Sequence, residues 1–252
     1  MIQRPGTDLA PVHVWLKPVE RDQRSAAHAL LLDLAATLLT DADTDTRFGS
    51  GFGSGSDAVP SFEGAPVLRH DAAGAPHVDP LAVSLSHSRR LVAVAAGLAG
   101  PVGIDLEDRY PRPVTALARR WFTPAELAWM SLQPEELEAF LHLWTAKEAV
   151  GKALGTGLRN TGLHREMPLP LPTVRDPLPT PTLRDPLLPL VGAPIGSVPG
   201  LVLVRLPVAA DAVVAVVVPV GTPAVEVCEH HGAALRSTAV SRTSFPVVVR
   251  GN

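Results

Sequence analysis

Residues 137–155 read LEAFLHLWTAKEAVGKALG, and this stretch is the clearest single element in the sequence. Its apolar side chains recur at helical spacing, and it ends in glycine, a residue type that commonly terminates helices. The pattern predicts a helix that begins near residue 133 and stops at this glycine. One face of the helix presents Trp144, Glu148 and Lys152 in succession, because residues four positions apart are neighbours on a helix surface.

Strand patterns lie on both sides of this helix in the sequence. Alternation of residue type predicts a hairpin at 81–97 and a third strand at 102–107. Residues 201–206 and 212–218 predict a second hairpin of the same kind. Strong helix formers with apolar residues at helical spacing predict a long helix over 23–39. Helices and strand hairpins are thus expected in both halves of the chain.

Two shorter elements are also expected. Residues 12–16 are extended, and Thr123-Pro124-Ala125-Glu126 has the form of a capping box with proline at the first helical position. The capping box predicts a helix from here to about residue 131. This structural role is sufficient to explain Glu126, so a functional role for it needs a separate argument.

The chain divides into two halves that look alike in kind. Residues 1–100 form the N-terminal half, with a loop rich in glycine and serine at 48–57. Residues 101–225 form the C-terminal half, with an insertion at 168–189 whose prolines exclude helix and sheet interiors. Residues 226–252 show little periodicity, and we expect a loosely attached tail.

Composition narrows the class of protein. With 46% hydrophobic and 19% charged residues, the chain has enough apolar material to fold around a core. A net charge of −3 without a basic run argues against nucleic acid as a partner, and the single cysteine, Cys228, excludes an internal disulfide framework. Residues 1–6 lack the apolar core of a signal peptide, and the longest apolar run, 212–220, is too short to span a membrane. We expect a soluble, cytoplasmic monomer.

The strand at 102–107 carries two carboxylates side by side. Asp105 and Glu107 point to the same face because alternate residues of a strand do so, while Ile104 and Leu106 face the core. Like charges this close raise each other's pKa unless a cation neutralises them, and Mg²⁺ or Mn²⁺ suits ligands that are all oxygen. The alternative is a strand end that simply emerges into water.

The helix face at 144–152 adds a third carboxylate. The simplest interpretation of Glu148 and Lys152 is an ion pair on the helix surface. Two features weaken that interpretation: Trp144 indicates that this face packs against apolar surface, and the chain has three lysines among its 22 basic residues, two of them in this segment. Glu148 is thus placed to complete a metal site with the strand carboxylates.

Two histidine-containing segments require different interpretations. Ser84-Leu85-Ser86-His87-Ser88 lacks the acidic partner and the elbow motif of a hydrolase triad, so its hydroxyls and His87 favour phosphate binding. Cys228-Glu229-His230-His231 imitates a metal cluster but has no partners at ligand spacing, and we discount it.

Three motifs occur along the chain in a fixed order. They are Ser84-x-Ser86-His87, Gly103-Ile104-Asp105-Leu106-Glu107 and Trp144-x-x-Lys147-Glu148-Ala149-x-x-Lys152. Together they resemble the signature of the 4'-phosphopantetheinyl transferase superfamily, specifically the surfactin-synthetase-activating type. The segment Arg120-Trp121-Phe122-Thr123-Pro124-Ala125-Glu126 resembles the family as well, and so do the closing strands at 201–218.

The resemblance implies a fold and a reaction. The fold would be of the α+β class, with two pseudo-symmetric halves, each a small antiparallel sheet packed with a long helix. It would bind coenzyme A and Mg²⁺ (or Mn²⁺) in the cleft between the halves. The reaction would move the 4'-phosphopantetheine arm of coenzyme A onto a serine of an acyl or peptidyl carrier protein, with release of adenosine 3',5'-bisphosphate.

The family pattern also assigns roles to residues. The metal ligands that it implies are Asp105, Glu107 and Glu148. The contacts to coenzyme A that it implies are Arg24, Ser86, His87 and Lys152. The catalytic residues that it implies are Asp105, Glu148 and Lys152, with Glu148 or a water near it as the base for the serine hydroxyl. Glu126 matches a family carboxylate near the metal.

One departure from the family pattern leaves an alternative open. The family often has Gly-Lys-Pro before the serine-histidine motif, whereas this chain has Gly74-Ala75-Pro76 and lacks that cation. Arg69, Arg89 and Arg90 are the nearby replacements. The alternative is a catalytically reduced protein of the same fold that binds coenzyme A or a carrier protein; a weaker one is a metal-dependent hydrolase of a diphosphate.

Overall fold

The computed structural model describes residues 9–48, 64–157, 162–170, 189–231 and 240–250. Its helices are α1 (Gln23–Phe48), α2 (Thr115–Trp121), α3 (Pro124–Ser131), α4 (Glu136–Ala153) and a 3₁₀ turn, η1 (Gly162–His164). Its strands are β1 (Val12–Pro18), β2 (Arg69–His70), β3 (Pro76–His77), β4 (Ala82–His87), β5 (Leu91–Gly97), β6 (Gly103–Asp108), β7 (Leu190–Pro194), β8 (Leu201–Leu206), β9 (Ala212–Pro219), β10 (Ala224–His230) and β11 (Val240–Val249).

The elements confirm the α+β prediction and most of the expected boundaries. Both hairpins are present as β4–β5 and β8–β9, and α3 begins with the predicted capping box at Thr123. The first helix is longer than predicted and runs to Phe48, because no proline or glycine between 40 and 48 stops it. Apart from Phe48, the Gly/Ser loop at 48–57 lies outside the described residues, as does the central part of the insertion, 171–188.

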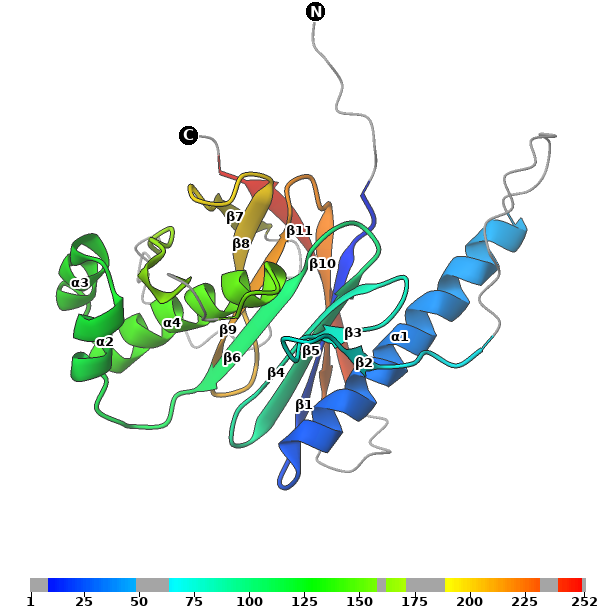
Figure 1. Cartoon of the computed structure of the whole chain (residues 1–252), viewed down its shortest axis with the longest axis horizontal. Helices are drawn as coiled ribbons and strands as arrows, with labels where there is room; N and C mark the ends of the chain where they lie inside the picture. Colours follow the sequence, from blue (N-terminus) through cyan, green and yellow to red (C-terminus); the bar gives the residue numbers. More distant parts are fainter. Residues whose placement is uncertain (1–8, 49–63, 158–161, 171–188, 232–239, 251–252) are drawn as a thin grey trace, which may run out of the picture.

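Nine strands form one curved sheet, in the order β4-β5-β1-β10-β11-β7-β8-β9-β6 (Figure 1). The first and last strands of this order meet, although no backbone ladder joins them. Ser84 on β4 accepts a hydrogen bond from the backbone N–H of Ile104 on β6 at 3.0 Å, and Ser86 accepts one from Leu106 at 3.4 Å. Serine side chains therefore close the sheet at the seam between the two halves.

The expected tail is wrong for the residues that the structure describes. Strand β10 pairs in parallel with β1, and β11 pairs with both β10 and β7, so these strands lie inside the sheet order. Alternation of buried Val225 and Val227 with polar neighbours was a strand signal in this segment. Strand β11 buries Phe245 alone, so its apolar pattern is weak and long-range backbone pairing determines its place.

Each long helix covers a different part of the outer surface of this sheet. Helix α1 packs on Val92, Val94 and Ala96 of β5, whereas α4 packs on β8 and β9. The apolar contacts beneath each of these helices form one buried cluster per helix. The side chains that point to the inner face of the curved sheet form a third cluster. Among the described helices, none has a long enough apolar stretch to cross a bilayer.

Strand β6 lies very close to α4, and a glycine makes this possible. A Cβ atom placed on Gly103 would lie 2.0 Å from the carbonyl oxygen of Ala149 and 2.7 Å from the amide nitrogen of Ala153. No side chain fits at that distance, so the glycine of the Gly-x-Asp-x-Glu motif is explained by packing. The close approach brings the carboxylates of β6 to the face of α4 that carries Glu148 and Lys152.

Candidate active site

Asp105 and Lys152 form the centre of the candidate site. The Lys152 Nζ atom donates to Asp105 Oδ1 at 2.7 Å, and the Ser86 hydroxyl donates to the same oxygen at 2.7 Å. Asp105 is 5% exposed, and its second oxygen, Oδ2, is buried without a hydrogen-bond partner in the described part of the chain. The surface ion pair between Glu148 and Lys152 is therefore not the main contact of this lysine.

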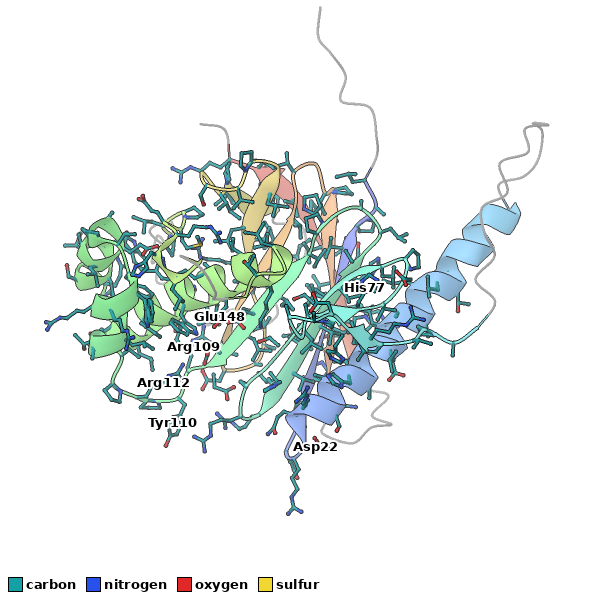
Figure 2. The ribbon with its side chains drawn as sticks, viewed as in Figure 1. Asp22, His77, Arg109, Tyr110, Arg112 and Glu148 are labelled. Atoms are coloured by element: carbon teal, nitrogen blue, oxygen red, sulfur yellow. The ribbon has the colours of Figure 1, made fainter. Side chains whose placement is uncertain are left out.

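Glu148 and Glu107 lie close enough to Asp105 to feel its charge. Burial, followed by repulsion from Asp105 and Glu107, raises the pKa of Glu148 to about 7, although Lys152 opposes the shift. Burial and the Asp105 charge also raise the pKa of Glu107, against the attraction of Arg112, which it contacts at 2.7 Å. The structure thus brings together the three carboxylates that the sequence singled out (Figure 2 labels Glu148 and Arg112).

These carboxylates do not form a preformed metal cage. Within the described residues, no group of three or more His, Cys, Asp or Glu side chains is arranged to hold a metal ion. The donor chemistry nevertheless fits a hard cation, because the Asp105 Oδ2 atom has no hydrogen-bond partner among the described residues and the neighbouring carboxyls repel one another.

The serine-histidine motif divides into structural and accessible residues. Ser86 is 5% exposed and bonded to β6, and Ser88 donates to Asp108 Oδ1 at 2.8 Å, so these hydroxyls hold the seam. Contact between Ser86 and coenzyme A stays a prediction. The structural role of Ser86, which is to join β4 to β6, was not predicted from the sequence. His87, by contrast, is exposed at the end of β4.

Basic side chains gather between the start of α1 and the end of β4. Burial is the main cause that lowers the pKa of His28, and the charges of His70, Arg24 and His87 add to it. The rings of His28 and His70 lie 5.2 Å apart, centroid to centroid. Of this basic group, Arg24 and His87 alone were singled out from the sequence. His28 lies four residues after Arg24 on the same face of α1, and this spacing could have indicated that His28 belongs to the group as well.

A cavity of about 520 Å³ adjoins Lys152. Ala75 and Pro76 line one side of it, Ser84 lines the sheet side, and Lys152 with Gly155 lines the helix side. Its size is within the range of small-molecule and cofactor sites. Position 75, where the family pattern often has a lysine, therefore lies at the wall of this cavity.

Two of the three arginines expected to replace that cation, Arg69 and Arg89, have other contacts. Arg69 lies 3.4 Å from Asp79, and the Arg89 guanidinium stacks over the Tyr110 ring at 4.3 Å (Figure 2 labels Tyr110). Neither of them lines the cavity. Arg24, which lies close enough to His28 to lower its pKa, is a further cation in the N-terminal half.

Glu126 is a structural residue in this chain. It is fully buried, and its carboxylate accepts hydrogen bonds from Lys147 Nζ at 2.8 Å and from the amide of Met167 at 2.9 Å. It also completes the capping box with Thr123. These contacts occupy the carboxylate, so the expectation that Glu126 also serves the metal site is wrong.

Buried carboxylates and a lysine beside a cofactor-sized cavity define an enzyme site suited to a phosphorylated substrate. Comparison with known proteins agrees. The sequence model described as "4'-phosphopantetheinyl transferase superfamily" matches residues 101–186. The chain is also 30% identical over 172 residues to the 4'-phosphopantetheinyl transferase HetI of Nostoc sp., which covers 58% of this chain and 70% of that protein.

Two further relatives match shorter segments. The 4'-phosphopantetheinyl transferase of Bacillus subtilis is 34% identical over 77 residues, 30% of this chain and 34% of its own. The holo-[acyl-carrier-protein] synthase of Geotalea daltonii is 44% identical over 63 residues, 23% of this chain and 50% of its own. The chain thus spans half or less of these two relatives. The chain belongs to the 4'-phosphopantetheinyl transferase superfamily, as its motifs predicted.

Proposed function

We propose that this protein transfers the 4'-phosphopantetheine group of coenzyme A to a serine of an acyl or peptidyl carrier protein and releases adenosine 3',5'-bisphosphate. The observation that carries the proposal is the contact of Lys152 with Asp105 at the wall of a cavity, with Glu148 on the same helix face. Family membership supplies the reaction, and this geometry supplies the groups that it needs.

Coenzyme A would occupy the cavity beside Lys152. The side chain of Lys152 is 26% exposed and lines the cavity, so its ammonium would contact a pyrophosphate while it stays bonded to Asp105. Arg24 and His87 would bind a phosphate at the far end. Burial and the neighbouring positive groups lower the pKa of His28, so this ring is mostly neutral near pH 7 and would contribute a hydrogen-bond donor.

Mg²⁺ would fit this site if phosphate oxygens of the substrate complete its set of ligands. Mg²⁺ keeps several waters and commonly binds through one or two carboxylates plus substrate phosphates, so a full protein cage is not needed. Asp105, Glu107 and Glu148 are the residues that would hold it, with Asp105 Oδ2 as the unoccupied oxygen. When bound, the ion would neutralise charge on the pyrophosphate.

Glu148 would act as the general base. Without a cation, burial and the neighbouring carboxylates raise the pKa of Glu148 to about 7. A bound cation would lower this pKa, and the ionised carboxylate would then accept the proton. Glu148, directly or through a water, would take the proton of the carrier serine as its oxygen attacks the phosphorus that bears the pantetheine arm. The bond to the adenosine-side phosphate then breaks, and Lys152 stabilises the charge on the departing bisphosphate.

The order of elements supports two related halves. In the first half β1, α1, β4 and β5 follow one another, with sheet order β4-β5-β1. In the second half β6, α4, β8 and β9 do so, with the matching order β8-β9-β6. Both sets are antiparallel and carry their long helix on the outer face. We infer that the halves are pseudo-symmetric; a cytoplasmic location and a monomeric state stay predictions.

Intact-mass spectrometry tests the function directly. A panel of apo-carrier proteins is incubated with the protein, coenzyme A and Mg²⁺, beside an EDTA control and the Glu148→Gln variant. A mass gain of one phosphopantetheine group, lost with EDTA and much slowed in the variant, is the expected result. The absence of any gain across acyl and peptidyl carriers would overturn the transferase function.

The catalytically reduced alternative rests on Ala75, and the same assay separates it. Coenzyme A binding by calorimetry without any transfer would favour a binding protein. Ala75→Lys adds a cation at the cavity wall, so it should tighten coenzyme A binding by about three- to tenfold and make binding more sensitive to salt. An unchanged affinity would show that position 75 does not face a phosphate of the bound molecule.

A further inference from the structure

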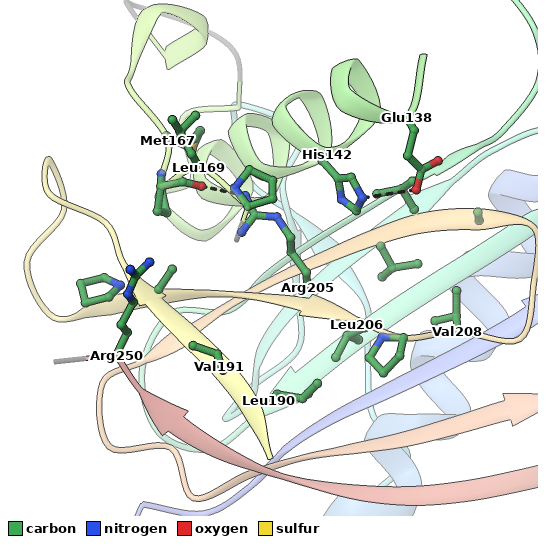
Figure 3. Close-up of a pocket in the computed structure, with 18 of the residues that line it drawn as sticks. Glu138, His142, Met167, Leu169, Leu190, Val191, Arg205, Leu206, Val208 and Arg250 are labelled. Carbon is green, nitrogen blue, oxygen red and sulfur yellow. Dashed lines mark hydrogen bonds and ion pairs between the residues drawn. The ribbon is translucent and has the colours of Figure 1, made fainter. Parts of the chain in front are cut away.

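A second and larger cavity lies away from the carboxylates, at the other end of α4. Its volume is about 970 Å³, it is open to solvent on one side, and residues of α4, β7, β8, β9 and the segment 166–170 line it (Figure 3). None of the proposed catalytic residues lines it. Much of its wall is apolar and includes Met167, Leu169, Leu190, Val191, Leu206 and Val208.

Arg205 of β8 brings a positive charge into this apolar wall. Its Nη2 atom donates to the carbonyl of Pro168 at 2.7 Å, while its Nε atom is buried and has no hydrogen-bond partner among the described residues. No carboxylate of the described residues pairs with it. Burial lowers the pKa of Arg205 to about 10, which reports how strongly the guanidinium is desolvated.

The other charges around the cavity do not neutralise Arg205. The Glu138 carboxylate contacts Arg109 at 2.7 Å and His142 at 3.3 Å, so it is already shared between two partners. Glu166 and Arg250 are exposed residues of the rim, of opposite charge. A largely buried cation therefore faces the cavity, and no anion of the described residues is paired with it.

His142 supplies a second unused polar atom. Its Nε2 atom faces Glu138, and its Nδ1 atom is buried without a partner in the described residues. Burial and the charges of Arg205 and Arg109 lower the pKa of His142 against the effect of Glu138, so the ring is neutral near pH 7. With Nε2 donating to Glu138, the neutral ring presents Nδ1 as a hydrogen-bond acceptor.

We propose that this cavity is a binding site for a small carboxylic acid with an apolar chain, its carboxylate on Arg205 and its chain along the wall formed by Leu190, Val191 and Leu206. A carboxylate matches the fork of a guanidinium and would satisfy the Nε–H group. The apolar chain would remove the wall from water, which contributes roughly 25 cal/mol per Å² of buried surface. A site of this volume accommodates a medium-length chain.

Isothermal titration calorimetry with sodium decanoate, below its micelle concentration, tests the site. We expect one decanoate to bind per chain. Inorganic phosphate has the negative charge without an apolar chain, and decanol has the chain without a carboxylate, so we expect both to compete weakly. An excess of coenzyme A should leave decanoate binding unchanged, because the two cavities have no lining residue in common. Displacement by coenzyme A, or several equivalents of decanoate per chain, would overturn the proposal.

A variant of Arg205 distinguishes specific binding at this site from nonspecific binding of decanoate elsewhere on the protein. Arg205→Met keeps an unbranched side chain and removes the unpaired buried charge, so the protein should stay folded while decanoate affinity falls at least about tenfold. The matched control is Arg119→Met, a loss of the same charge from the exposed face of α2. Wild-type affinity in Arg205→Met, with a thermal melt that shows a folded protein, would contradict the proposal. Arg205→Lys, which retains the charge without the fork, should bind more weakly than wild type and more tightly than Arg205→Met.

Discussion

The ammonium of Lys152 on α4 lies 2.7 Å from Asp105 Oδ1 on β6, across 47 positions of the chain. This contact holds the lysine toward the sheet and leaves a quarter of its side chain exposed to the cavity beside it. The cation that is expected to contact pyrophosphate is therefore positioned before substrate arrives.

Lys152→Met should reduce carrier-protein modification by about 10²- to 10³-fold, because a preorganised cation near the leaving group is lost. The protein should remain folded, since the lysine is not fully buried. Rates with saturating coenzyme A, measured by mass spectrometry, check the effect. As a control, the His230→Ala and His231→Ala double variant should retain near-normal turnover; a loss comparable to that of Lys152→Met would mean that the site is elsewhere.

Glu148→Gln should make the protein more stable at alkaline pH than the wild type. The folded protein binds the Glu148 proton more tightly than the unfolded chain does, so ionisation costs stability above pH 7 and the cost disappears as pH falls toward 4.5. Because the group is partly exposed, we expect a difference of about 2 kcal/mol at pH 8 that vanishes near pH 4.5. Urea unfolding of both proteins without divalent ions, at pH 8 and pH 5, measures it. A difference of the same size at both pH values would contradict the raised pKa.

Gly103→Ala should destabilise the protein by about 3 kcal/mol or more, since its Cβ would overlap the backbone of α4. Gly196→Ala is the matched control, because a Cβ at that position meets nothing within 4 Å. Thermal melts of the two variants decide the question. Equal melting temperatures would show that β6 and α4 can separate at little cost.

Lys147→Met should cost about 3 to 5 kcal/mol, because it leaves the buried Glu126 carboxylate without its cation. Adding Glu126→Gln should restore much of this stability, since a neutral amide can still cap α3. Denaturant unfolding of the single and double variants gives the coupling between the two positions. Strictly additive losses would indicate that the ion pair itself contributes little.

How far the sequence predicts the structure depends on whether a signal is local. The helix around Trp144 and the hairpins were predictable, because periodicity fixes which face is buried. The acidic residues Asp105 and Glu148 were singled out by type and spacing. The partner of Lys152 was not predictable from spacing, because helical geometry offers Glu148 whereas the contact made is with a distant strand.

The missed features share a physical cause. Strand β11 has few buried apolar side chains, so its place depends on backbone pairing with β10 and β7 rather than on its own pattern. Ser86 lies in a hydroxyl-rich segment typical of phosphate binding. Its hydroxyl instead accepts a hydrogen bond from the backbone of β6, a strand of the other half of the chain. His28 has a role in the basic group only once α1 and β4 are placed together.

The serine seam between β4 and β6 has a consequence for solubility. An unpaired edge strand is a template on which another chain can add a strand, and long apolar edges promote aggregation. Here the two ends of the sheet order face each other, and hydroxyl groups of Ser84 and Ser86 satisfy backbone amides that would otherwise invite a neighbour. The motif that borders the active site thus also protects the molecule against edge-to-edge association with its own copies.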